Sequence, residues 1–238
     1  PFQAALVTGR FLLPLLVVLC AACARLPAIT PVPGGLPSAS DRAPCSVFPE
    51  GSWQFLHSIR AEMPGGINFA MMGLTVISSR LRTSRSVIMT LEGFVVFDGE
   101  YDQHLIVHRA LPPFDSPHFA GGLMDDIRLI FLEPDGPLIG VGELENGSVV
   151  CRHAAPDGGT VDIGLQRDGS WELRRYDPAQ HLTRTVRSLP GAGNKAGFPE
   201  ALELAARGDQ TYKLVMTLVE AVQIAAEKMT KDERRRTG

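Results

Sequence analysis

Thiols are the most reactive side chains of this sequence, and Cys23 is the one whose neighbours suggest a specific chemistry. It follows Ala21 and Ala22, and an apolar run from Phe11 to Leu19 lies upstream, preceded by Arg10. A base, a short apolar core and small residues before a cleavage point are the layout of an export signal. The apolar core is about a dozen residues long, whereas a membrane-spanning helix needs roughly 20. A permanent transmembrane anchor is therefore the weaker interpretation.

The segment Ala21-Ala22-Cys23 resembles the bacterial lipobox, although Cys20 stands where that motif usually has Leu. The resemblance implies cleavage before Cys23 and acylation of its thiol, which would attach the mature chain to a membrane through its N-terminal lipid. Ala24 replaces the Asp that resembles an inner-membrane retention signal, so we expect the periplasmic face of the outer membrane. The alternative is a secreted protein cut near Ala22 without a lipid.

Two further thiols, Cys45 and Cys151, remain once the signal is removed and Cys23 is acylated. In an oxidising compartment they could pair in a disulfide, or both could stay reduced, and the sequence does not decide between these alternatives.

Other residues with catalytic or ligand potential do not form a convincing set. His104 and His108 are four apart on an expected strand and share a face, but no nearby Cys or carboxylate run completes a metal site. Asp125 and Asp126 are adjacent on an expected helix and point in different directions, so helix solubility explains them better than acid-base chemistry. No Gly-x-Ser-x-Gly elbow is found in the sequence. We therefore expect no enzyme, no metal and no cofactor.

Charge argues against nucleic acid as a partner. The formal net charge is -3, and removal of residues 1–22 deletes only Arg10, giving -4.

The elements that would position any site are mostly strands. Apolar and polar residues alternate from Trp53 to Met63, Pro64-Gly65-Gly66 then predicts a turn, and a second long strand should cover 67–78. Shorter strands are predicted at 86–92, 94–98, 104–109, 138–143, 148–153, 160–166, 171–176, 182–188, 201–205 and 211–219. Asp98-Gly99 and Tyr101-Asp102 are expected to mark a hairpin. Short connections require antiparallel neighbours, so the fold should be a meander.

One helix should interrupt this meander. Ser116 and Pro117 suit its N-cap and first position, and Glu133-Pro134 should end it. Its apolar face should lie on the concave side of the sheet. We predict a mainly β fold with α: a strongly curved antiparallel sheet, or open β-barrel, with a helical lid.

The chain divides into four expected parts. Residues 1–22 are the signal peptide, and residues 23–51, rich in Pro, Gly and Ser, are a tether. Residues 52–224 form the folded domain, and residues 225–238 are a charged tail. Two alternatives remain for the end of the chain. A second helix could run from about Ala221 into this tail, or the tail could be disordered.

The order of elements resembles the lipoprotein-localisation factors LolA and LolB and their uncharacterised outer-membrane relatives. The resemblance is carried by Trp171 to Tyr176, by Phe198 to Leu204 and by Tyr212 to Met216. It implies a LolA/LolB-like half-barrel that holds acyl chains of lipids or acylated proteins between sheet and lid. The residues of the lid and the sheet that are expected to line such a cavity are Trp53, Phe55, Phe69, Met71, Phe119, Leu123, Ile127 and Ile130. For any single one of them, a place in an ordinary core is the stronger interpretation.

A basic loop is the second feature that the resemblance touches. Arg80, Leu81 and Arg82 place one apolar side chain among bases, and LolB-like proteins resemble this in carrying an exposed leucine on a loop. It is either a membrane-contact loop or a solvated turn. The function expected for the whole chain is an outer-membrane lipoprotein that binds or carries acyl chains, and the alternative is a non-catalytic structural or assembly lipoprotein with a closed core.

Overall fold

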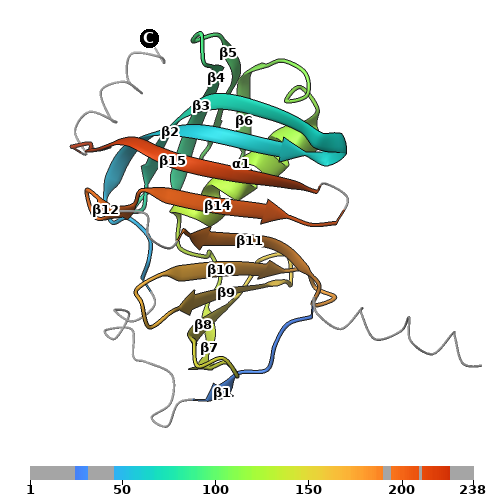
Figure 1. Cartoon of the computed structure of the whole chain (residues 1–238), viewed down its shortest axis with the longest axis vertical. Helices are drawn as coiled ribbons and strands as arrows, with labels where there is room; N and C mark the ends of the chain where they lie inside the picture. The colour runs from blue at the N-terminus through green and yellow to red at the C-terminus, as the bar shows by residue number, and fades with distance from the viewer. Residues whose placement is uncertain (1–24, 32–45, 190–193, 209–210, 226–238) are drawn as a thin grey trace, which may run out of the picture.

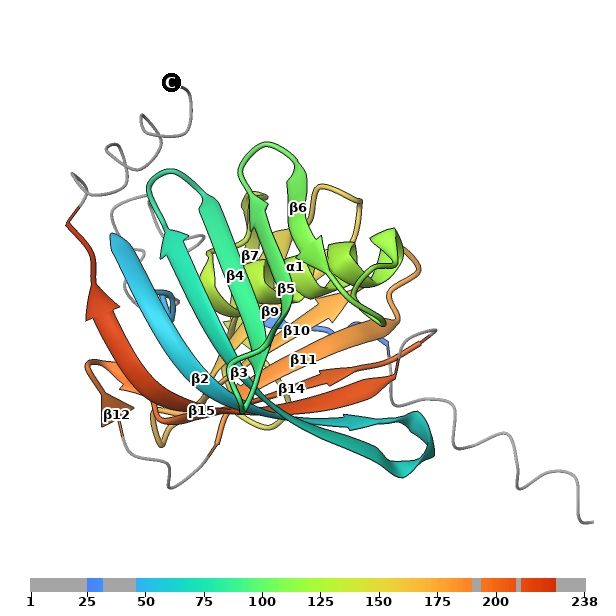
Figure 2. The same ribbon diagram turned by 90° about the horizontal axis from the view of Figure 1, so that it is seen from above.

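The computed structural model describes residues 25–31, 46–189, 194–208 and 211–225. One large antiparallel sheet of 13 strands dominates it, and α1 (Pro117–Phe131), the single α-helix of the described residues, packs on the concave side (Figures 1 and 2). A short 3-10 helix, Pro64–Gly66, forms the expected turn between the first two long strands. The spatial order of the strands is β1-β7-β8-β9-β10-β11-β14-β15-β2-β3-β4-β5-β6, so the sheet is not closed. The predicted fold class, a curved antiparallel sheet with a helix inserted midway, is confirmed.

Most strand bounds lie within one residue of those predicted, but the strands predicted at 86–92, 94–98 and 211–219 are observed at Thr83–Thr90, Val95–Tyr101 and Tyr212–Gln223. The strand bounds are β1 (Thr30–Pro31), β2 (Ser52–Met63), β3 (Ile67–Ser78), β4 (Thr83–Thr90), β5 (Val95–Tyr101), β6 (Leu105–Ala110), β7 (Leu138–Glu143), β8 (Val149–Ala154), β9 (Thr160–Leu165), β10 (Trp171–Tyr176), β11 (Leu182–Ser188), β14 (Ala201–Ala206) and β15 (Tyr212–Gln223). A separate small hairpin joins β12 (Asn194–Lys195) to β13 (Phe198–Pro199).

Strands β2 and β15 join the two halves of the sheet. They pair from Lys213 opposite Glu62 to Gln223 opposite Trp53. The odd-numbered residues of β2 face the concave side, because Phe55, His57, Ile59 and Ala61 are all buried. The predicted helix from about Ala221 is wrong, since Ala221 pairs with Phe55 inside β15. The residues from 226 onward lie outside those that the structure describes.

The expected turn at Asp98-Gly99 is also wrong, because both residues lie within β5 and the chain turns only after Tyr101. Gly99 instead makes room for a neighbouring side chain within the strand. A Cβ atom on Gly99 would lie 2.6 Å from Cζ of Phe97, a distance that side chains do not tolerate. The buried Phe97 ring therefore requires glycine at this place in the strand.

The beginning of the expected tether, residues 25–31, is docked on the sheet instead of hanging free. The Leu26 amide donates to the Gln180 carbonyl at 3.0 Å, the Pro27 carbonyl accepts from Arg152 at 2.8 Å, and Thr30 pairs with Glu143 in β7. Two glycines of β7 permit this approach. A Cβ atom on Gly142 would lie 2.5 Å from the Thr30 carbonyl oxygen, and one on Gly140 would lie 2.9 Å from Ile29.

Further along the expected tether, Val47 and Phe48 pack against the core. Residues 32–45 and the signal peptide lie outside the described residues, as does Cys23. Cys151 is fully buried in β8 and is disulfide-bonded. The other cysteines of the chain, Cys20, Cys23 and Cys45, are outside the described residues, so the pairing of Cys45 with Cys151 stays a prediction.

Candidate apolar ligand pocket

A pocket of about 100 Å³ lies between the N-terminal half of α1 and the concave face of the sheet. Tyr212 is the one lining residue whose side chain carries a polar group. The lining residues are Ile59, Ala61, Met63, Phe69, Met71, Ile88, Pro113, Phe114, Phe119, Leu123, Tyr212 and Leu214. Such a surface offers no set of polar groups to orient a polar substrate, and it suits an aliphatic ligand.

The period-two pattern of the strands builds this wall. Ile59, Ala61 and Met63 are alternate residues of β2, so all three face the same side, and Phe69 and Met71 do the same on the neighbouring strand β3. Methionine side chains at two of these positions can adapt to an irregular ligand. The helix closes the opposite side with Phe119 and Leu123, which are four residues apart and therefore share a face.

The pocket is partly open at the edge of the sheet where β2 turns into β3. Phe69 lines it while remaining 47% exposed, and Ile67, two residues nearer the turn, is 54% exposed. Pairing of β3 with β4 begins only at Met71. The tip of the β2–β3 hairpin thus projects beyond β4, as Figure 2 shows at the lower right, and extends the apolar concave face outward.

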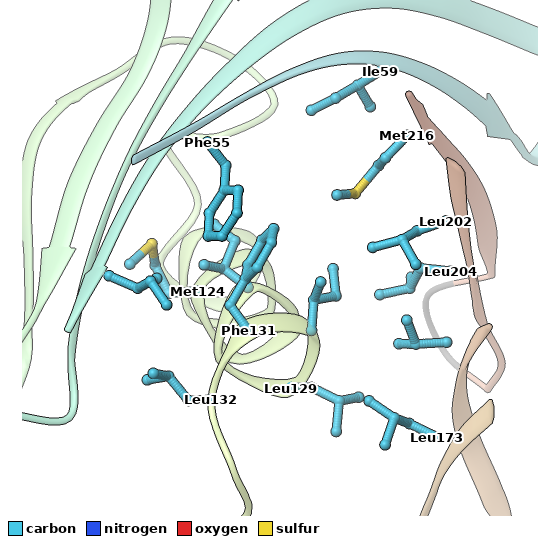
Figure 3. Close-up of a cluster of buried hydrophobic side chains, with 14 of the residues drawn as sticks. Phe55, Ile59, Met124, Leu129, Phe131, Leu132, Leu173, Leu202, Leu204 and Met216 are labelled. Carbon is cyan, nitrogen blue, oxygen red and sulfur yellow. The ribbon is translucent and has the colours of Figure 1, made fainter. Parts of the chain in front are cut away.

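The C-terminal half of α1, in contrast, packs into a closed core (Figure 3). The Phe131 ring stacks on Phe55 at 5.0 Å between centroids, and Phe198 meets Phe55 edge-on at 4.9 Å. Met124, Ile127 and Ile130 are buried. Four of the residues expected to line a cavity, Phe69, Met71, Phe119 and Leu123, do line the pocket. The other four do not line it: Phe55, Ile127 and Ile130 belong to the packed core, and Trp53 packs against that core, with its ring stacked on Phe55.

A buried polar cluster fixes the helix to the sheet beside the pocket. Arg184 of β11 donates from Nε to Asp126 Oδ1 at 2.8 Å, and the hydroxyl of Tyr212 in β15 donates to Asp126 Oδ2. We call these three residues the polar clasp. Asp126 is only 3% exposed, and burial raises its pKa while Arg184 and Tyr212 oppose that rise. Burial and the neighbouring carboxylate raise the pKa of Tyr212.

The solubility role expected for Asp126 is therefore wrong, whereas its neighbour Asp125 is exposed. The burial of Asp126 could have been predicted from its spacing to the apolar residues of the helix. Asp126 is three residues after Leu123 and four before Ile130, which places it on the apolar stripe of the helix. Arg184 and Tyr212 carry no comparable signal, because the pairing of distant strands brings them to the helix.

A second cluster fixes the end of α1 to the turn between β3 and β4. Arg128 and Arg82 both form ion pairs with Asp135, and the Arg128 guanidinium lies 4.1 Å from the centroid of the Tyr101 ring. Leu81 is 51% exposed on this turn. Arg82 is thus engaged by the protein itself, which favours the solvated-turn interpretation of the basic loop.

The structure separates the two histidines that the sequence places on one strand face. His104 lies in the turn before β6 and not on the strand, so it does not share a face with His108, whose Nε2 lies 3.3 Å from Glu100. Within the described ranges, no group of three or more His, Cys, Asp or Glu side chains could hold a metal ion. His57 is buried on the concave face between Phe55 and Phe131, and burial lowers its pKa to about 4. None of the helices in the described part of the chain has the length and apolar character needed to span a membrane.

Comparisons with known proteins give fold similarity only. No protein-family model matches the chain, and no curated protein sequence matches it. Among solved structures, a LolA superfamily protein from Nitrosomonas europaea aligns with a TM-score of 0.52 at 12% identity, covering 76% of this chain and 90% of that one.

Two further structures align less closely. An outer-membrane lipoprotein-sorting protein domain from Vibrio parahaemolyticus has a TM-score of 0.45 at 7% identity, covering 76% of this chain and 90% of that domain. A DUF1329 family protein from Desulfovibrio piger has a TM-score of 0.43 at 10% identity, covering 74% and 86%. The alignment with the Nitrosomonas protein confirms the fold that the sequence resemblance predicted. The chain has a LolA-like fold.

Proposed function

We propose that this chain is an outer-membrane lipoprotein, acylated at Cys23, that binds an acyl chain of a lipid or an acylated protein between α1 and the concave sheet. The apolar pocket is the observation that carries the proposal. It is lined by adaptable side chains, and its opening lies at one edge of the sheet. The LolA-like fold, which the chain shares with the LolA superfamily protein from Nitrosomonas, is consistent with this role.

The energetics suit an aliphatic ligand. Each methylene transferred from water into an apolar site contributes roughly 0.8 kcal/mol, so even a partly enclosed chain gains several kcal/mol. Among the lining residues only Tyr212 has a polar side-chain group, and its hydroxyl already donates to Asp126, so a ligand without polar atoms leaves that hydroxyl satisfied. An acyl chain therefore meets no unpaired donor in the pocket.

The helix is held in a way that permits entry. Asp126 and Arg128, which form its ion pairs with the sheet and with Asp135, both lie in its C-terminal half. The N-terminal half carries Phe119 and Leu123, which are only partly buried, and the Gly121-Gly122 pair, which costs about 1 kcal/mol per glycine relative to alanine. We infer that this half moves outward to enlarge the pocket while the C-terminal half stays fixed.

A second candidate is a structural or assembly lipoprotein that never binds a ligand. The packed core around Phe55 and Phe131 favours it, because much of the concave face is already filled by the helix. The two candidates differ in what the pocket holds. A carrier copurifies with lipid, whereas a structural protein leaves the pocket empty.

The test uses the Cys23→Ala chain, so that no covalent lipid confuses the measurement. Organic extraction and mass spectrometry should find bound phospholipid or fatty acid, and 11-(dansylamino)undecanoic acid should bind with enhanced fluorescence. Ala61→Phe fills the pocket and should exclude about two methylenes, which weakens binding roughly tenfold.

The matched control is Ala70→Phe. Ala70 is exposed on the opposite face of neighbouring strand β3, so the same change there should leave the affinity unaltered. No extractable lipid together with equal dansyl binding by the two variants would favour the structural lipoprotein.

A further inference from the structure

The first described residues and the mouth of the pocket lie at the same edge of the sheet. Arg25 forms a bridge with His181, in the turn between β10 and β11. Because consecutive strands are antiparallel, this turn, the end of β14, the start of β15 and the β2–β3 hairpin all lie at one edge. Figure 1 shows them together on the right, with the chain entering β1 from that side.

Exposed apolar side chains gather where two hairpins end at this edge. Ile67 and Phe69 belong to the β2–β3 hairpin, and Leu91 and Phe94, 61% and 54% exposed, belong to the β4–β5 turn. Thr90, where that turn begins, pairs with Met71 on β3, so the two hairpin ends are neighbours. We call these four residues the apolar rim. Phe69 also lines the pocket, which makes the rim continuous with it.

We propose that the apolar rim dips into the bilayer that holds the acylated Cys23, so that the pocket opens directly onto the membrane. This rests on the proposed function, which supplies both the acylated cysteine and the acyl ligand. Cys23 precedes Arg25 by two residues, a reach of at most about 7 Å. The lipid would therefore leave the protein at the edge that carries the rim, and any other orientation would have to lift the docked segment off the sheet.

The chemistry of the rim suits hydrocarbon rather than anionic headgroups. Charged residues of both signs flank the rim: Glu92 lies in the β4–β5 turn, Glu62 pairs with Asn68 in the β2–β3 hairpin, and the Arg109 guanidinium lies 5.0 Å from the centroid of the Phe94 ring. The basic β3–β4 turn with Leu81 lies at the opposite edge, since β3 runs from the rim toward it. Insertion of the apolar rim into a bilayer should therefore depend on apolar contact, and the strength of membrane binding should change little with ionic strength.

The test is photocrosslinking of the full chain in its native membrane. p-Benzoylphenylalanine replaces Leu91, Ile67 or, as the matched control at the opposite edge, Leu81. All three side chains are more than half exposed, so the substitutions should be tolerated. Irradiation followed by mass spectrometry should find phospholipid adducts at positions 91 and 67, at least tenfold more than at position 81, and unchanged in 0.5 M salt.

Each contrary result overturns the proposal. Adducts mainly at position 81 would mean that the opposite edge faces the membrane, protein adducts at 91 and 67 would mean a protein partner, and adducts nowhere would mean that neither hairpin touches lipid. Leu91 and Ile67 do not line the pocket, so dansyl fatty-acid binding is measured separately. If the fatty acid binds but no lipid adducts form at positions 91 and 67, only the membrane insertion of the rim is refuted. If these adducts form but the fatty acid does not bind, only the proposed function of the pocket is refuted.

Discussion

Asp126 on the helix and Arg184 on β11 lie 2.8 Å apart, although 58 positions separate them in the sequence. Asp126 is buried and Arg184 partly buried, and the Tyr212 hydroxyl completes the cluster from β15. Removing one partner leaves a buried charge without compensation, which typically costs 3–5 kcal/mol. The clasp therefore decides how firmly the helix is held on the sheet.

Asp126→Ala should lower the free energy of unfolding by about 3 kcal/mol, because Arg184 and the Tyr212 hydroxyl would lose their shared acceptor. Urea denaturation followed by circular dichroism measures this. Asp125→Ala, at the exposed neighbouring position, should change the same free energy by less than about 0.5 kcal/mol. Equal effects of the two substitutions would mean that the clasp contributes nothing specific.

Amide hydrogen exchange should divide the helix into two halves. Without lipid, amides in the first turns, around Phe119 and Leu123, should exchange faster than those of β2, and added fatty acid should slow them. Amides beyond Asp126 should be protected in both states. Equal protection along the whole helix, with and without lipid, would mean that α1 is a permanent part of the core.

His57 should make the protein less stable in acid. Burial lowers its pKa from 6.5 to about 4, so between these values the unfolded chain binds more protons than the folded one. Stability contributed by the neutral ring is present above pH 6.5 and is lost as the pH falls toward 4. The contribution of His57 should fall by about 2 kcal/mol between pH 7 and pH 4.5.

The measurement is urea denaturation at both pH values for the wild type and His57→Phe, which removes the titrating group from its place beside Phe131. The variant should lose about 2 kcal/mol less than the wild type on acidification. His118→Phe, at an exposed position, should behave like the wild type. If His57→Phe loses as much stability on acidification as the wild type, the loss must come from other titrating groups.

Cys23→Ala should abolish metabolic labelling by an alkyne analogue of palmitate and release the protein from membranes. The reason is that the motif offers one acylated thiol, directly after Ala21 and Ala22. Cys45→Ala serves as the comparison and should keep both the label and the membrane fraction. Labelling that persists without Cys23 would reject the lipoprotein assignment.

Peptide mapping without reduction should recover Cys45 linked to Cys151. Cys151 is disulfide-bonded and fully buried, and Val47, two residues after Cys45, packs against the same core. Cys45→Ser should free the Cys151 thiol for alkylation after unfolding and lower the melting temperature. A linkage from Cys151 to any other cysteine would disprove the pairing.

The sequence predicted the strands well where one face is buried and the other is exposed. Trp53 to Met63 alternates cleanly, and the observed strand β2 differs from that prediction by one residue. The turn predicted at Asp98-Gly99 was wrong. This dipeptide favours a turn, but its glycine is also suited to a strand position where a ring such as that of Phe97 excludes a Cβ atom. Local composition cannot distinguish these two uses, since the difference depends on a tertiary contact.

The site was predictable only in part for a related reason. Periodicity identifies Phe69 and Ile127 equally well as inward-facing, but the packing of α1 decides that one lines a pocket and the other fills the core. The docking of Leu26 and Thr30 could not be read from a segment rich in Pro and Gly, because their partners, Gln180 and Glu143, are more than a hundred residues away.

The pairing of Trp53 with Gln223 sets the order in which this domain can be completed. The first long strand and the last are neighbours, so the strands from β2 to β6 and those from β7 to β14 meet only when β15 is added between them. A chain that emerges from an export channel N-terminus first would leave one backbone edge of β2 unpaired until its final strand arrives. Contacts of such high sequence separation form slowly. In an exported chain, assembly of the whole sheet would thus follow translocation, and a chain lacking β15 would leave two half-sheets with unprotected edges, which favour proteolysis or aggregation.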